Sequence, residues 1–189
     1  LAPADLVPLL SYALRRGRCR YCSAPIDPRH PLIEALAAAI GLIAFIAVPG
    51  PQGLLAAAFG WLLLALAMLD FDHLWLPDRL TVPLALAGLG AGLAGFAPPL
   101  AERLLGGGVG YGALALIAWL YRQLRGHEGL GAGDAKLLGA IGLWTGWPVL
   151  LFILLGASVV GLAGVLACRL AGRRIDAATP LPFGTCLAV

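Results

Sequence analysis

The chain has 189 residues, of which 60% are hydrophobic and 12% are charged, and its formal net charge is +3. Its mean hydropathy is +0.90. Because a soluble domain carries about 25% charged residues, this composition excludes an ordinary soluble domain and indicates an integral membrane protein.

Uncharged stretches predict the membrane spans. They cover residues 35–69, 80–101, 104–121 and 137–168, and a spanning helix needs about 20 apolar residues. Pro49-Gly50-Pro51 divides the first stretch into two helices, and Trp147-Pro148 divides the last. The stretches do not alternate as a β-barrel requires. The pattern predicts an all-α polytopic membrane helix bundle with about six spans, at 32–48, 53–69, 80–96, 105–121, 135–147 and 149–168.

The two ends of the chain differ from this bundle. Residues 1–31 are mixed and polar, so we expect a small cytoplasmic segment that contains cysteines, followed by the membrane bundle at 32–189. The chain begins at Leu1 rather than Met, and it ends at Val189 within what reads as the start of another apolar helix. We therefore expect a fragment of a longer protein with eight spans.

The positive charges test the predicted topology. When the six spans alternate across the membrane, Arg103 is the one cation that falls on the far side. Positive residues concentrate on the cytoplasmic side, which is therefore predicted to hold Arg15, Arg16, Arg18, Arg20, Arg29, Arg79, Arg122, Arg125, Lys136, Arg169, Arg173 and Arg174. The net positive charge reflects this topology, so we expect the lipid bilayer, and no nucleic acid, as a partner.

Carboxylates gather at two places on the cytoplasmic side. The first begins with Asp70, which ends the uncharged stretch 35–69 and is followed by Asp72 and Asp78. Ionisable residues at the edge of a span are functional candidates. Asp70 and Asp72 point apart on a helix, and Asp78 is placed to cap the next helix. For Asp72 and Asp78, a solvated surface role is equally compatible with the sequence.

The second place is Gly131-Ala132-Gly133-Asp134, with Glu128 before it and Lys136 after it. Asp134 is placed to cap a helix N-terminus, where a negative charge is favourable. Capping alone does not explain the glycines, which lack a Cβ and so allow another segment to lie close.

Asp70 and Asp134 are separated by two predicted spans, so the chain returns to the same face and the two carboxylates can meet there. Two close carboxylates share one proton and titrate as a coupled pair. One can then activate water while the other protonates a scissile carbonyl oxygen, as in aspartic proteases. The sequence therefore predicts a proteolytic site.

Both aspartate patches resemble those of the type IV prepilin peptidases, membrane aspartyl proteases named for a Gly-x-Gly-Asp element. By this resemblance, Asp70 and Asp134 are the catalytic aspartates. Segments that resemble family motifs occur in the family's order at Leu9-Leu10-Ser11-Tyr12, Cys19–Cys22, Pro31-Leu32-Ile33-Glu34, Asp70–Pro83, Glu128–Leu138 and Pro180–Gly184.

The resemblance implies an aspartic endopeptidase in the bacterial inner membrane, multi-pass, with its active site on the cytoplasmic side. Such an enzyme removes the short basic leader from type IV prepilins or type II secretion pseudopilins, and many members then N-methylate the new N-terminus with S-adenosyl-L-methionine. Proteolysis by the dyad itself needs no cofactor. We expect the acids to attract the leader in a substrate site formed by Gly131, Gly133, Glu128, Asp72, Asp78 and Lys136.

Cys19 and Cys22 have the spacing of metal ligands, but structural zinc takes four ligands. By the resemblance, they are half of a zinc site whose other pair lies upstream, in a cytoplasmic segment associated with methyl transfer. Cys168 and Cys186 read as small core residues.

Two other functions stay open. A related peptidase that acts on archaeal pre-flagellins is disfavoured by the cysteine pair. A polytopic ion- or proton-coupled transporter would use the acids as a relay, although transporter carboxylates usually lie near the middle of the bilayer. The chain also departs from the family pattern at Thr185-Cys186, where a proline usually follows Phe183-Gly184.

Overall fold

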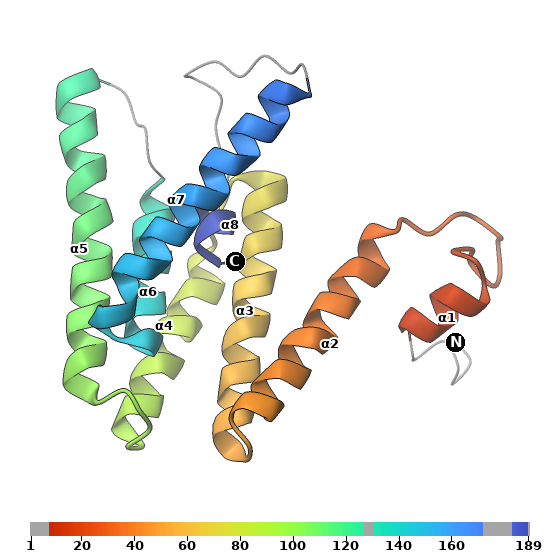
Figure 1. Ribbon diagram of the computed structural model, residues 1–189, viewed down its shortest axis with the longest axis horizontal. Helices are drawn as coiled ribbons and strands as arrows, with labels where there is room; N and C mark the ends of the chain where they lie inside the picture. The colour runs from red at the N-terminus through yellow and green to blue at the C-terminus, as the bar shows by residue number, and fades with distance from the viewer. Residues whose placement is uncertain (1–7, 127–130, 172–182, 189) are drawn as a thin grey trace. The chain divides into compact units, whose positions relative to one another are not determined.

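The computed structural model describes residues 8–126, 131–171 and 183–188. Within these ranges the regular structure is helical, apart from one β-bridge between Arg18 and Pro25. This confirms the predicted all-α class. The helices are α1 (Pro8–Leu14), α2 (Arg29–Ala47), α3 (Pro51–His73), α4 (Asp78–Leu93), α5 (Leu100–Arg125), α6 (Ala132–Thr145), α7 (Trp147–Leu170) and α8 (Phe183–Ala188) (Figure 1).

Each of the six predicted spans coincides with one helix, from α2 to α7. Four of them, α2, α3, α5 and α7, are long and apolar enough to cross a membrane. The other two are shorter than the roughly 20 residues of a full crossing, since α4 has 16 residues and α6 has 14. The chain is thus a polytopic membrane protein, and the number of complete crossings stays a prediction.

Prolines and glycines set the helix boundaries. A proline lacks the N–H that is unpaired in a first turn anyway, and α3 begins at Pro51 while α7 has Pro148 in its first turn. At the other end of a helix, a glycine with positive φ is favourable. α5 ends this way at Gly126, with φ of 73° and its N–H donating to the Arg122 carbonyl at 2.9 Å.

Two compact units make up the chain, Leu1–Trp61 and Leu62–Val189, and α3 contributes to both. In the first unit, the Trp61 indole N–H donates to the Ala37 carbonyl of α2 at 2.8 Å. The division predicted at residue 31, between a polar segment and the membrane bundle, stays a prediction.

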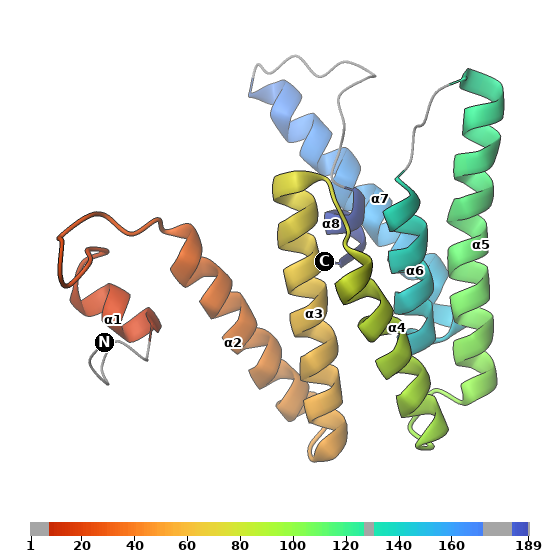
Figure 2. The same cartoon turned by 180° about the vertical axis from the view of Figure 1, so that it is seen from behind.

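The core of the second unit is built around α6, the short helix that packs against both α4 and α5 (Figure 2). Leu137, Leu138 and Ile141 of α6 are fully buried. A Cβ added to Gly106 of α5 or to Gly142 of α6 would collide with the carbonyl oxygen of the other residue. The two helices therefore touch at their backbones, a contact that small residues allow in membrane proteins.

Arg103, in the first turn of α5, bonds to the C-terminal halves of α4 and α6. Its side chain is 2% exposed. Helix C-termini carry partial negative charge, so a buried guanidinium satisfies several carbonyls there at once. Its nitrogens donate to the carbonyl oxygens of Gly88 (3.1 Å), Phe96 (3.4 Å), Ala97 (2.8 Å), Pro98 (2.9 Å), Leu143 (2.9 Å) and Trp144 (3.2 Å).

Replacing Arg103 with leucine should destabilise the second unit. The change leaves buried carbonyls without donors, and each costs about 1–3 kcal/mol, so we expect a loss of about 3 kcal/mol or more. Thermal unfolding in detergent measures it. The control is Arg79→Leu, because Arg79 is exposed and such changes stay within about 0.5 kcal/mol. Equal melting temperatures for the two variants would contradict this structural role.

Candidate functional site

Asp70 lies in the last turn of α3 and is 5% exposed. Its Oδ2 accepts hydrogen bonds from the backbone N–H of Thr185 at 2.6 Å and from the Thr185 hydroxyl, whose oxygen lies 3.0 Å away. Thr185 belongs to α8, so this carboxylate joins two helices that are remote in the sequence. A buried carboxylate needs such donors, because an unpaired buried charge is very costly.

Asp134 lies in the first turn of α6 and is 7% exposed. Gly131 is the N-cap of α6, and the N–H groups of Gly131 and Gly184 bond to the Asp134 carboxylate. Asp134 is thus not the N-cap itself but lies three residues after it, where an acid can bind the N-cap N–H. Burial and the nearby Asp70 carboxylate nevertheless raise the pKa of Asp134 above its ordinary value.

The structure therefore brings both predicted catalytic residues to one place, the start of α8. Thr185 bonds to Asp70, and the preceding residue, Gly184, bonds to Asp134. Both carboxylates also act electrostatically on the next residue, Cys186. The arrangement is a pair of buried, electrostatically coupled acids, in which one carboxylate can hold a proton while the other accepts one.

Leu76 packs against two glycines of the site, Gly133 and Gly184. Leu74 directly follows α3, with φ of 50° and its N–H bonded to the Asp70 carbonyl at 2.8 Å. The chain then turns so that Leu76 is buried. A Cβ added to Gly133 would lie 2.9 Å from the Leu76 Cβ, and one added to Gly184 would lie 2.8 Å from the Leu76 Cδ1. These two glycines leave the room that Leu76 occupies.

Two other predicted substrate-site residues form an ion pair, since the Lys136 ammonium lies 2.8 Å from an Asp78 carboxylate oxygen. Both side chains are about half exposed, at 45% and 59%. The pair lines one side of a cavity of about 380 Å³ between α4, α5 and α6. Asp72 is exposed near the end of α3, and Glu128 lies outside the described residues.

Cys19 and Cys22 sit in a tight turn before α2. The Cys19 N–H donates to the Ala24 carbonyl at 2.9 Å. Hydrogen bonds from the backbone of Cys22 and of Tyr21, and from the Cys22 thiol, lower the pKa of Cys19. A turn that favours a thiolate, with a second sulfur beside it, suits two zinc ligands. Within the described residues, no group of three or more candidate ligands forms.

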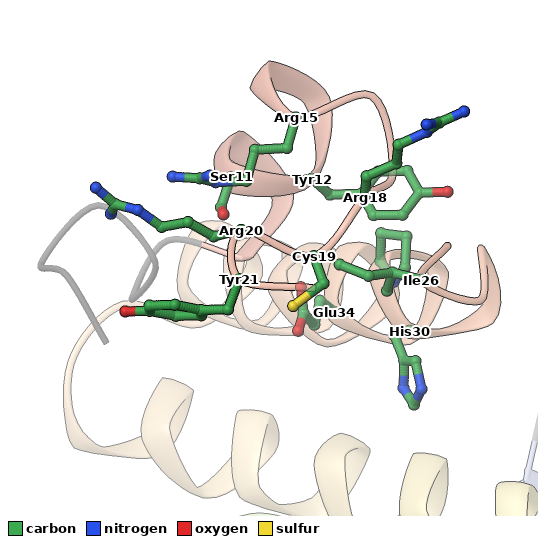
Figure 3. A pocket seen from close by; sticks show the side chains of 11 residues that line it. Ser11, Tyr12, Arg15, Arg18, Cys19, Arg20, Tyr21, Ile26, His30 and Glu34 are labelled. Atoms are coloured by element: carbon green, nitrogen blue, oxygen red, sulfur yellow. The ribbon is translucent and has the colours of Figure 1, made fainter. Parts of the chain in front are cut away.

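A basic cavity of about 240 Å³ adjoins this turn (Figure 3). Cys19 is among its lining side chains, together with Arg15, Arg18 and Arg20. The sequence indicated the positive charge of this segment, but it did not indicate a cavity.

Comparison with known proteins defines the family to which this chain belongs. The family described as type IV leader peptidases matches residues 57–166, and the bacterial Peptidase A24 N-terminal domain matches residues 1–48. The chain therefore belongs to the type IV leader peptidase family.

Relatives named prepilin leader peptidase/N-methyltransferase resemble nearly the whole chain. The Burkholderia pseudomallei protein is 46% identical over 96% of this chain and 59% of its own length. The Aeromonas hydrophila protein is 41% identical over 97% of this chain and 63% of its own length. The Pseudomonas aeruginosa protein is 39% identical over 100% of this chain and 65% of its own length. The chain therefore spans about three fifths of the length of these relatives. No solved structure matches it.

Thr185 and Leu76 were not among the site residues predicted from the sequence. For Thr185 the available signal was its place directly after Phe183-Gly184, where the family pattern usually has a proline. For Leu76 the available signal was an apolar side chain between the polar segments 70–73 and 78–79.

Replacing Gly184 with alanine should disturb the site and lower stability. The new Cβ would lie 3.0 Å from Cγ and Oδ2 of Asp70 and 2.8 Å from Leu76, and overpacking of this kind costs about 1–3 kcal/mol. Thermal unfolding in detergent is the measurement. Gly156→Ala is the matched control, because a Cβ there meets open space. A Gly184→Ala variant as stable as this control would show that the glycine is not needed for packing.

Proposed function

We propose that this chain is the catalytic portion of a prepilin leader peptidase, and that Asp70 and Asp134 cleave the leader from type IV prepilins or type II secretion pseudopilins. One observation carries the proposal: two buried carboxylates from α3 and α6 converge on Gly184 and Thr185. Membership of the type IV leader peptidase family supports the choice of substrate.

The two carboxylates take different roles because their surroundings differ. Asp70 accepts two hydrogen bonds at Oδ2, which suits the base, whereas burial and the nearby Asp70 raise the pKa of Asp134, which favours Asp134 as the acid. Asp70 removes a proton from water as the water oxygen attacks the scissile carbonyl carbon, and Asp134 protonates the carbonyl oxygen. The tetrahedral intermediate then collapses: the C–N bond breaks, the leaving amine takes the proton from Asp70, and Asp134 recovers its own.

The membrane placement is also part of the proposal. We propose that the chain is a multi-pass protein of the bacterial inner membrane with the dyad on the cytoplasmic side, which the positive-inside distribution of its cations supports. Both aspartates lie in terminal turns of their helices, at the edge of the bundle. A substrate whose helix stays in lipid can therefore present its leader there. A transporter relay near mid-bilayer fits this position less well.

The full-length protein is also proposed to N-methylate the new N-terminus, as the names of its relatives suggest. S-adenosyl-L-methionine would supply the methyl group. Cys19 and Cys22 would provide two thiolate ligands to a structural zinc ion, which fits the lowered pKa of Cys19. In this chain, the turn before α2 places the two cysteine sulfurs next to each other.

Asp70→Asn and Asp134→Asn should each abolish leader cleavage. Amide groups cannot exchange the proton, and general acid–base catalysis contributes about 10²–10⁴-fold, so each variant should fall at least about a hundredfold. The assay mixes the full-length protein with a prepilin in detergent and follows the shortened product. Glu102→Gln, which changes a carboxylate at the start of α5, should keep full activity. Residual cleavage close to wild type in either asparagine variant would refute the dyad.

The acids around the site are proposed to attract the basic leader. Neutralising Asp72, Asp78 and Glu128 together should raise the KM for a prepilin several-fold at low salt, and the effect should shrink at high salt because exposed charges are screened. A prepilin with a neutral leader should show no such change. An unchanged KM for the basic leader at low salt would rule out this role.

A further inference from the structure

We propose that Thr185 is a positioning residue for Asp70, and that its hydroxyl serves this carboxyl group in both of the charge states that the reaction requires. The inference rests on the proposed peptidase function, and it adds a residue that the aspartate motifs do not contain.

The geometry around Thr185 gives its hydroxyl two acceptors. Oγ1 lies 3.0 Å from Oδ2 of Asp70 and 3.0 Å from the carbonyl oxygen of Ala67, one turn earlier in α3. A hydroxyl carries a single proton for donation and two lone pairs. It can therefore donate to only one of these oxygens at a time.

The charge of Asp70 decides which acceptor the hydroxyl uses. When Asp70 is ionised, its carboxylate is the stronger acceptor, because hydrogen bonds to charged groups are about twice as strong as neutral ones. When Asp70 has taken the proton from water, the hydroxyl can turn to the Ala67 carbonyl. With the proton on Oδ2, a lone pair on Oγ1 then accepts a hydrogen bond from the carboxyl O–H. Only hydrogens move, so Asp70 keeps its position through the cycle.

The backbone N–H of Thr185 complements the hydroxyl. It lies 2.6 Å from Oδ2 and is fixed by the backbone of α8, so it holds the carboxyl group in either charge state. The same turn also carries the Gly184 contact to Asp134. Loss of the hydroxyl alone should therefore impair the chemistry while leaving the site assembled.

The experiment compares two substitutions of Thr185 in the full-length protein, with a prepilin as the substrate in detergent. Thr185→Val keeps the shape and the N–H but lacks the hydroxyl, and it should lower kcat about 10- to 100-fold with KM unchanged. Thr185→Ser restores the hydroxyl and should recover kcat to within about threefold of wild type. This rescue and the separation of kcat from KM would not follow from a purely structural role.

Thr145→Val provides the matched control. The Thr145 hydroxyl also bonds to a helix carbonyl, that of Ile141 at 3.1 Å, but at the other end of α6. Its loss should leave kcat unchanged. Thermal unfolding verifies that each variant is folded, and Thr185→Ala, which also lacks the hydroxyl, replaces the valine variant if that one unfolds.

Two results would overturn the inference: a kcat for the variant without the hydroxyl equal to that of wild type, or a serine variant as slow as the valine variant. Failure of the proposed function looks different. In that case wild type would not shorten the prepilin, or Asp70→Asn would still cleave it.

Discussion

Two carboxyl groups cannot be buried next to each other without hydrogen-bond partners, and the rest of the site follows from this constraint. One short segment gives a donor to each, since Gly184 bonds to Asp134 and Thr185 bonds to Asp70, and Gly131 adds a second donor to Asp134. Burial of such groups is costly unless they are hydrogen-bonded. The ends of α3, α6 and α8 therefore depend on one another, and the residues that perform the proposed chemistry also hold these helices together.

Much of the fold was predictable because the membrane imposes simple rules on the sequence. Helices of about 20 apolar residues and breaks at proline and glycine place α2 to α7 correctly. The same reasoning places Asp70 and Asp134 at helix ends on one face. The acid at the start of α6 was also expected from the sequence, although the N-cap is Gly131 and not Asp134.

The remaining contacts depend on distances that sequence patterns do not contain. Asp70 and Thr185 are 115 residues apart in the chain, and no spacing rule links an acid in one helix to a threonine in a much later one. Arg103 was visible only as the cation that broke the topology pattern. The position of Arg103 is explained by tertiary contacts, because its guanidinium donates to carbonyl groups of α4, α6 and the segment before α5. The predicted role of Lys136 in substrate binding gave no hint of its pairing with Asp78.

The backbone contact between Gly106 and Gly142 bears on how accurately Asp134 is held. Where side chains form an interface, a change of rotamer can absorb a small sliding motion between two helices, but a contact between backbones offers no such slack. Eight residues of α-helix, at about 1.5 Å each, separate Gly142 from Asp134. The depth of the acid in the bundle is therefore set about 12 Å away, by two residues that have no functional groups of their own.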